Sequence, residues 1–265
     1  MPRFRTVEIS NPQYEANGLR FITVKTTNLK GRGDICVYAP KVEKTDTLPI
    51  VILLHGVYGS SWSWAFSSGV HLKLDELIRA GKLPPMILAM PSDGLWGDGS
   101  AYLPHNSFNF EQWISSDVPD AVISCIDGAN SKSPLFISGL SMGGFGALRI
   151  GAKYGDRFKA IAGHSSITSL PQMKLFVQES LKSYIQQDVT DEDLLATFKA
   201  YRQHLPPIRF DCGASDLLVN YNRDLHKKME REGMLHIYEE YPGGHEWPYW
   251  SEHIIDSLKF FAAQL

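Results

Sequence analysis

The sequence pattern with the clearest chemical meaning is Gly139-Leu140-Ser141-Met142-Gly143, which matches G-x-S-x-G. It follows an apolar run at 135–138 and precedes a helical pattern over 142–154. In this strand–turn–helix context the motif presents a nucleophilic serine, and the N-terminus of the helix favours developing negative charge. We therefore predict a nucleophile at Ser141, with a glycine- and serine-rich turn without chemistry as the alternative.

A serine nucleophile needs a base and an acid that orients the base. Asp216 comes just past the predicted strand 208–212, where a carboxylate can reach an imidazole. His245 lies in a glycine-rich loop after the last predicted strand, 235–241. The chain order serine, aspartate, histidine is one that such triads use. We predict that His245 takes the proton of Ser141 and that Asp216 holds the imidazole in the required tautomer.

Other acidic and histidine residues compete for these roles. Asp211 lies within or at the end of the strand that comes before Asp216, and is expected to be a buried structural partner. His164 follows a strand but comes before the acid in the chain. His226 and His253 fall inside predicted helices and are expected at the surface.

An acyl-transfer site also needs backbone N–H donors for the oxyanion. The loop His55-Gly56-Val57-Tyr58-Gly59 closes the apolar run 50–54 and can offer one of them. We predict Val57 as this donor, with Tyr58 as its neighbour to check, and Met142, the residue after the nucleophile, as the other. His55 is expected to brace the loop through hydrogen bonds rather than act as a base.

The elements that must position these residues alternate along the chain. Short strands separated by turns come first, then apolar runs typical of strands buried on both faces alternate with helical patterns. This alternation predicts an α/β fold with a mostly parallel sheet, helices on both faces and antiparallel N-terminal edge strands. The predicted strands are 6–9, 19–25, 34–38, 50–54, 86–90, 135–138, 160–163, 208–212 and 235–241, and the helices are 72–80, 111–126, 142–154, 218–232 and a C-terminal stripe of Trp250, Ile254, Leu258 and Phe261.

One segment, about 167–207, breaks this alternation. It is long, rich in helix formers and holds no strand-like run, and Thr190-Asp191-Glu192-Asp193 is typical of a helix N-terminus. We interpret it as a helical insertion that could form a lid or pocket wall, because substrate sites lie at the carboxyl ends of the strands. An ordinary crossover of two helices is the alternative.

Length and composition limit the class of protein. The 265 residues fit one α/β domain over 1–265, and the net charge of 26 − 29 = −3 argues against a nucleic-acid partner. No run approaches the roughly 18 apolar residues of a membrane span. No apolar leader is visible after Met1, so we expect a cytoplasmic location. Three widely spaced cysteines indicate neither a disulfide framework nor a paired-cysteine zinc site. Self-association into a homo-oligomer is left open.

With these residues in place, the chain resembles the putative-esterase family of α/β-hydrolases, from about Leu48 to the C-terminus. The resemblance rests on the runs 139–147, 212–216 and 243–247. It implies an α/β-hydrolase fold and a serine–histidine–aspartate hydrolase without metal or organic cofactor. It places the triad on Ser141, Asp216 and His245, and the oxyanion donors on Val57 and Met142. Val57 stands where the family often has glycine.

The resulting functional hypothesis is hydrolysis of small acyl esters through an acyl-enzyme. Within the same mechanism, the alternatives are a thioesterase similar to S-formylglutathione hydrolase and an esterase of carbohydrate-linked acetyl or feruloyl groups. A non-catalytic binding protein on a hydrolase fold is the alternative from a different class. It should have lost a triad member, and none of the expected positions is lost.

Three aromatic residues, Tyr58, Trp96 and Trp247, are expected to contact substrate. Trp96 lies in the Gly- and Asp-rich stretch 91–99 and is placed with Tyr102 near the acyl or alcohol group. A solvated surface loop is the alternative for that stretch. The aromatic cluster Trp62, Trp64 and Phe66 is compatible with an exposed patch, a pocket wall or core.

Overall fold

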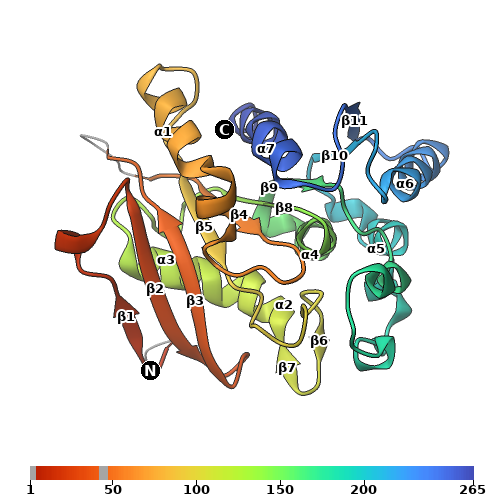
Figure 1. Ribbon diagram of the computed structural model, residues 1–265, viewed down its shortest axis with the longest axis horizontal. Coiled ribbons are helices and arrows are strands. Elements are labelled where there is room, and N and C mark those ends of the chain that lie inside the picture. Colours follow the sequence, from red (N-terminus) through yellow and green to blue (C-terminus); the bar gives the residue numbers. More distant parts are fainter. Residues whose placement is uncertain (1–3, 42–46) are drawn as a thin grey trace.

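A nine-stranded sheet forms the centre of the computed structural model, which describes residues 4–41 and 47–265 (Figure 1). The strands lie in the order β1-β2-β3-β5-β4-β8-β9-β10-β11. β1, β2, β3 and β5 pair antiparallel in turn, and β5, β4, β8, β9, β10 and β11 are parallel. This arrangement confirms the predicted fold class. The bounds are β1 Val7–Ile9, β2 Leu19–Thr26, β3 Gly31–Tyr38, β4 Ile50–Leu54, β5 Ile87–Pro91, β8 Leu135–Gly139, β9 Phe158–His164, β10 Ile208–Gly213 and β11 Ile237–Tyr241, with a separate hairpin of β6 Pro104–His105 and β7 Phe108–Asn109.

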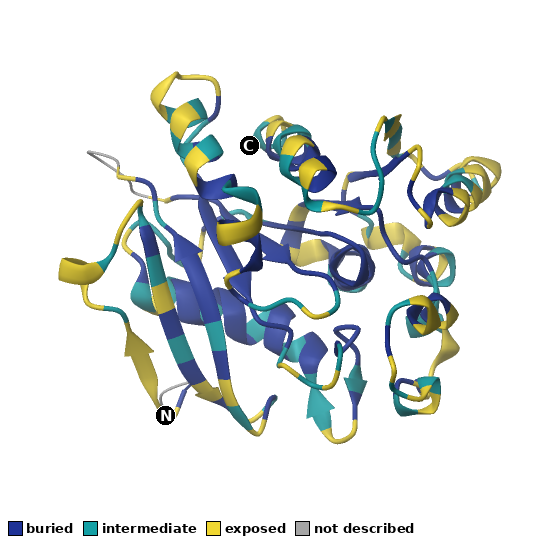
Figure 2. Ribbon diagram, in the orientation of Figure 1, coloured by how far each residue is buried: buried dark blue, intermediate teal, exposed yellow. Residues whose placement is uncertain are grey.

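The central strands β4 and β5 are apolar along their whole length, and both of their faces are covered. In β4, Ile50, Ile52 and Leu54 pack into one core, and Val51 and Leu53 pack into the core on the other side of the sheet. Successive side chains of a strand point to opposite faces. A continuous apolar run therefore predicts burial on both sides, whereas the short edge strand β1 is exposed (Figure 2).

Helices cover both faces of the sheet (Figure 1). On one side lie α1 (Val70–Arg79) and α7 (Trp247–Ala262), whose buried residues share a core with the odd-numbered side chains of β4. On the other side lie α3 (Val118–Cys125), α4 (Met142–Lys153), α5 (Leu194–Ala200) and α6 (Val219–Arg231). Within the described ranges, none of the helices has the length and apolar character that crossing a bilayer requires.

The helix predicted over 111–126 is interrupted. It consists of α2 (Phe110–Gln112), a π-helical turn (Trp113–Asp117) and α3. Pro119 explains the change, because proline lacks an N–H and its ring clashes with the carbonyl of the residue four positions earlier. A π turn before Pro119 widens the backbone there. The apolar residues that the sequence spaces by four, Ile114, Val118, Val122 and Ile126, still lie in the core.

The spacing of Leu218, Tyr221, Leu225 and Met229 predicts that these four residues share the buried face of α6, which is partly wrong. Leu218, Leu225 and Met229 are buried, but Tyr221 is exposed and Asn222 is buried in its place. The Asn222 side chain donates a 2.9 Å hydrogen bond to the Ser166 carbonyl. A polar residue that satisfies a buried carbonyl gives no apolar signal in the sequence.

The predicted insertion is only partly helical. Between β9 and β10 the chain forms short 3₁₀ turns and a single α-helix, α5, instead of two helices; the turns are Leu170–Leu175, Leu181–Ser183, Val189–Glu192 and Arg202–His204. Asp193 caps α5 by accepting a 2.9 Å hydrogen bond from the Ala196 N–H, as the acidic run 190–193 predicts. Residues 1–3, at the start of the stretch searched for a leader, and residues 42–46 lie outside the described part.

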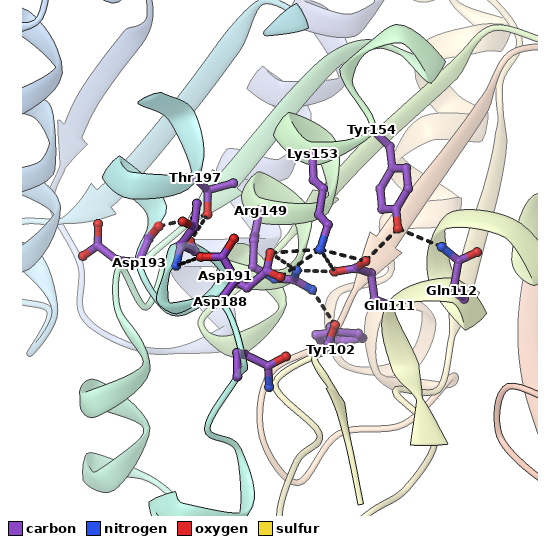
Figure 3. A network of polar contacts seen from close by, with 12 residues as sticks. Tyr102, Glu111, Gln112, Arg149, Lys153, Tyr154, Asp188, Asp191, Asp193 and Thr197 are labelled. Atoms are coloured by element: carbon purple, nitrogen blue, oxygen red, sulfur yellow. Dashed lines mark hydrogen bonds and ion pairs between the residues drawn. The ribbon is translucent and has the colours of Figure 1, made fainter. Parts of the chain in front are cut away.

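A buried ionic network ties this insertion to the helices beneath it (Figure 3). The Arg149 side chain of α4 is fully buried and pairs with Glu111 of α2 and with Asp191 of the insertion. Its Nη2 donates a 2.7 Å hydrogen bond to the Tyr102 carbonyl. Lys153 joins the same two carboxylates. One arginine thus links α2, α4, the Tyr102 loop and the insertion.

Candidate active site

Ser141 occupies the sharp turn between β8 and α4. Its backbone lies at φ 55° and ψ −119°, a region that costs a non-glycine residue about 1–3 kcal/mol. Surrounding hydrogen bonds hold the turn: the Ser141 N–H donates to the His164 carbonyl at 2.9 Å, and the Ser141 carbonyl accepts from the Ile167 N–H at 3.2 Å. The strained conformation is therefore fixed by the neighbouring β9 and its following loop.

Two glycines of the motif are required by close backbone contacts. A Cβ on Gly139 would overlap the Gly143 carbonyl, and a Cβ on Gly143 would overlap the carbonyl oxygen of Leu54. Because these neighbours are backbone atoms, they have no rotamer by which to move away. The spacing G-x-S-x-G is thus a packing requirement of the turn that carries Ser141.

The structure brings Ser141, His245 and Asp216 together although they are far apart in the chain. The Nε2 atom of His245 lies 3.0 Å from Ser141 Oγ, and its Nδ1 lies 2.9 Å and 3.1 Å from the two carboxylate oxygens of Asp216. Asp216 and His245 follow β10 and β11, which are parallel neighbours that end together at Gly213 and Tyr241. The carboxyl ends of adjacent parallel strands therefore set the distance between them.

Asp216 and His245 are each held by groups outside the triad. Asp216 is buried, and its Oδ1 accepts a 2.7 Å hydrogen bond from the Leu218 N–H. The ring of His245 stacks on Phe176, with centroids 5.2 Å apart, and meets the edge of Trp250 at 5.0 Å. Sequence reasoning missed Phe176; the only available signal was the crowding of apolar residues at 170–177.

The two expected oxyanion amides come from the loop after β4 and from the start of α4. Met142 is the first residue of α4. Because the first amides of an α-helix have no intrahelical acceptor, its N–H is not used within the helix. The Val57 N–H donates to no other residue in the described part of the chain. The Tyr58 N–H, by contrast, donates to the Asp98 carbonyl at 2.9 Å. Of these two adjacent amides, therefore, the one without a hydrogen-bond acceptor among the described residues is that of Val57.

His55 braces the loop that carries Val57, as predicted. The Asp93 N–H donates to His55 Nε2 at 3.0 Å, so the ring proton resides on Nδ1, which donates to the Gly56 carbonyl at 2.7 Å. The ring is buried, and both of its nitrogens are used. His55 therefore holds backbone in place and is not available as a base.

The other candidates have structural positions. Asp211 is fully buried and binds Arg209, His164 and the Tyr249 hydroxyl. The expectation for His253 is wrong: its ring is buried and stacks on Tyr241 with centroids 4.1 Å apart, because α7 turns that side toward the sheet.

His226 is half-buried rather than a surface residue, and its Nδ1 lies 2.8 Å from His236 Nε2. Within residues 4–41 and 47–265, no three or more histidine, cysteine or acidic side chains gather as metal ligands would.

A cavity of about 370 Å³ opens beside Ser141 and His245. Tyr58 and Trp247, both expected at the substrate, line it, and so does Phe176. Trp62 is 48% exposed and forms another part of the wall. Its two aromatic neighbours have different positions: Trp64 is in the core, and Phe66, 65% exposed, lies outside this cavity.

Trp96, the third residue expected to contact substrate, does not line this cavity. It packs against His105 and Tyr184 with ring centroids 4.6 Å and 5.3 Å apart. Tyr102 is fully buried, and its hydroxyl donates to the His55 carbonyl at 2.9 Å. The stretch around Trp96 folds back on the β6–β7 hairpin and the insertion, neither of which the sequence predicted in that position.

The parallel sheet with helices on both faces and the strand–turn–helix at Ser141 define an α/β-hydrolase fold. Within that class the chain belongs to the putative esterase family, which matches residues 26–261. An acetyl esterase of Caldicellulosiruptor saccharolyticus is 28% identical to it over 236 residues, which cover 82% of this chain and 85% of that protein.

Solved structures of esterases share the fold. A ferulic acid esterase matches with a TM-score of 0.79 at 22% identity, covering 98% of this chain and 99% of that one. An S-formylglutathione hydrolase from Staphylococcus aureus matches with a TM-score of 0.77 at 17% identity, covering 96% and 99% of the two chains. Together with the family match, these similarities place the chain among ester hydrolases.

Proposed function

We propose that the chain is a serine carboxylic-ester hydrolase that acts on small acyl esters through an acyl-enzyme. The observation that carries the proposal is the connected set of contacts from Ser141 Oγ to His245 Nε2 at 3.0 Å and from His245 Nδ1 to Asp216 at 2.9 Å. Distances of this kind allow a proton to pass from the serine to the imidazole as the serine attacks.

The proposed reaction has two halves. Ser141 Oγ attacks the ester carbonyl carbon while His245 Nε2 takes the hydroxyl proton, and the Val57 and Met142 N–H groups stabilise the oxyanion. The intermediate then expels the alcohol, which receives that proton from His245. In the second half water attacks the acyl-enzyme, His245 again takes and returns a proton, and the acid leaves Ser141 free. Asp216 keeps the Nδ1 proton in place and stabilises the imidazolium in both halves.

The size of the cavity supports a small acyl group. Its volume of about 370 Å³ lies toward the lower end of the range for small-molecule sites. Aromatic side chains and the His245 ring line much of it, which suits a short apolar acyl chain. The acetyl esterase relative is consistent with this size.

The test is turnover of nitrophenyl acetate and butyrate by wild type and by Ser141→Ala. We expect the variant to lose essentially all triad-dependent turnover. Ser138→Ala is the matched control: Ser138 lies on β8, the strand that leads into Ser141. Its buried hydroxyl has no hydrogen-bond partner among the described residues, so its removal should leave the rate unchanged. Wild-type turnover by Ser141→Ala would refute the proposal.

Two further measurements extend this test. A fluorophosphonate probe should label wild type and Ser138→Ala but not Ser141→Ala. Parallel rates on oxygen esters of increasing acyl length and on S-formylglutathione should show the highest kcat/KM for a short-chain oxygen ester. A preference for the thioester would replace the proposed substrate class while leaving the mechanism intact.

A further inference from the structure

The turn 97–99 connects the insertion to the loop that carries Val57. The Asp98 carbonyl accepts the Tyr58 N–H at 2.9 Å. The Asp98 N–H in turn donates to Glu179 Oε1 at 2.9 Å, and Asp98 Oδ2 accepts the Gln178 N–H at 2.8 Å. A continuous chain of hydrogen bonds therefore runs from Glu179 of the insertion, through both backbone groups of Asp98, to the residue that follows Val57.

Close packing holds the same turn on both sides. Gly97 has φ 54°, and a Cβ there would overlap the Glu179 carboxylate. A Cβ on Gly99 would lie 2.5 Å from Met142 Sδ and 3.4 Å from Val57 Cγ1. The turn thus contacts Glu179 on one side and the two residues with proposed oxyanion amides on the other.

Val57 itself has no hydrogen bond to fix its amide in the described part of the chain. Its direction is therefore set by the residues on either side. Upstream, His55 holds the Gly56 carbonyl at 2.7 Å. Downstream, Tyr58 adopts φ 58°, and its N–H is held only by Asp98. Movement of Asp98 would free the Val57–Tyr58 peptide, which directly follows the peptide plane that presents the Val57 N–H.

Resting on the proposed function, we propose that Glu179 and Asp98 are positioning residues that set the direction of the Val57 oxyanion amide. The segment Phe176–Glu179 then serves both parts of the site: Phe176 stacks on His245 and accepts the Tyr58 hydroxyl at its carbonyl, and Glu179 fixes the turn that holds Tyr58. The insertion completes the oxyanion hole without providing a donor to it.

The critical variant is Glu179→Ala, which removes the acceptor for the Asp98 N–H. Misplacing a catalytic group by about 1 Å can lower a rate by roughly 100-fold, so we expect kcat to fall about 10- to 100-fold. KM for nitrophenyl acetate should change by less than about 2-fold, because the lost interaction acts in the transition state. The pH profile of kcat/KM should keep its midpoint, because the His245–Asp216 pair is untouched.

Two further variants separate positioning from a structural role. Glu179→Gln keeps an acceptor oxygen, and the second Glu179 oxygen has no hydrogen-bond partner among the described residues, so this variant should retain at least about half the wild-type kcat. Glu192→Ala is the matched control, since it removes a carboxylate that accepts the Gln186 N–H at 2.7 Å in the same insertion, away from the turn 97–99. It should retain kcat. If Glu179→Ala does not fold, Asp98→Ala, which keeps both backbone bonds, should show a smaller loss of kcat in the same sense.

Three results would overturn the inference. The first is an unchanged kcat in folded Glu179→Ala or, where that variant does not fold, in Asp98→Ala. The second is an equally large loss of kcat in Glu192→Ala, and the third is a shifted midpoint of the pH profile in Glu179→Ala, which would mean that the effect passes through His245. Inactive Ser141→Ala together with fully active Glu179→Ala refutes this inference alone, whereas active Ser141→Ala refutes the proposed function beneath it.

Discussion

The three residues of the proposed triad are fixed by three different physical means. Backbone hydrogen bonds and close packing of its turn hold Ser141, a hydrogen bond from the Leu218 N–H holds Asp216, and two aromatic rings hold His245. Only His245 depends on side-chain packing against the insertion, through Phe176. Geometry at this residue is therefore the part of the site most sensitive to changes elsewhere in the fold.

Replacing Asp216 by asparagine tests the orientation of the imidazole. The amide oxygen can keep the Leu218 hydrogen bond, but the amide nitrogen then faces His245 Nδ1 and favours the tautomer with its proton on Nε2. That tautomer cannot accept the Ser141 proton. We expect kcat for nitrophenyl acetate to fall by about 10⁴-fold, with the thermal midpoint within a few degrees of wild type.

The matched control is Asp224→Asn, which removes the carboxylate of an exposed ion pair with Lys228 on α6. It should leave kcat unchanged. A loss below about 10-fold in Asp216→Asn would contradict the proposed role of Asp216.

At the scale of elements, the sequence predicted the strands, the main helices and the turn at Ser141, because each of these depends on residues that are close in the chain. The central strands are recognised by continuous apolar runs and the main helices by the spacing of their apolar residues. The motif at Ser141 is recognised by the strand and helix that flank it. The contacts made by Trp96 and Phe176 depend on how the segment 167–207 folds over the site. Apart from α5, the helical elements of that segment are short 3₁₀ turns, which have no periodic apolar face. The sequence therefore could not show which residues the segment brings to the cavity.

The junction of β8 and α4 offers a test of the packing argument. Gly143→Ala places a methyl group against the Leu54 and His55 carbonyls, which are backbone atoms of the next strand and its loop. The helix must shift away from β4, so we expect the free energy of unfolding to fall by at least about 2 kcal/mol.

Gly31→Ala is the matched control, because its Cβ would lie 3.5 Å from the nearest atom, the Leu29 carbonyl oxygen. Urea titrations should place it within about 0.5 kcal/mol of wild type. Equal stability of the two variants would show that the close approach at Gly143 is not required.

At the scale of the whole molecule, Arg149 is the residue through which the layers under the site are joined. A fully buried guanidinium needs its charge balanced, and Glu111 and Asp191 provide that balance from α2 and the insertion. Burial would raise the pKa of Glu111, but the charge of Arg149 and hydrogen bonds from Tyr154 and Arg149 outweigh it and lower the pKa to about 2. The charged form of Glu111 is thus strongly favoured in the folded protein.

This pKa predicts how stability depends on pH. A carboxyl group whose pKa falls from its ordinary 4.5 to about 2 on folding contributes about 3 kcal/mol above pH 4.5, and that contribution is lost as the pH falls toward 2. Glu111→Gln should therefore be about 3 kcal/mol less stable than wild type at pH 7, and the difference should narrow by about 1.4 kcal/mol per pH unit below pH 4.5. Urea denaturation of both proteins between pH 7 and pH 3 measures it, with the exposed Glu252→Gln as the control that should follow wild type at every pH. If the difference in free energy of unfolding between wild type and Glu111→Gln stayed constant with pH, the charge of Glu111 would not be what holds these layers together, and packing around Arg149 would be.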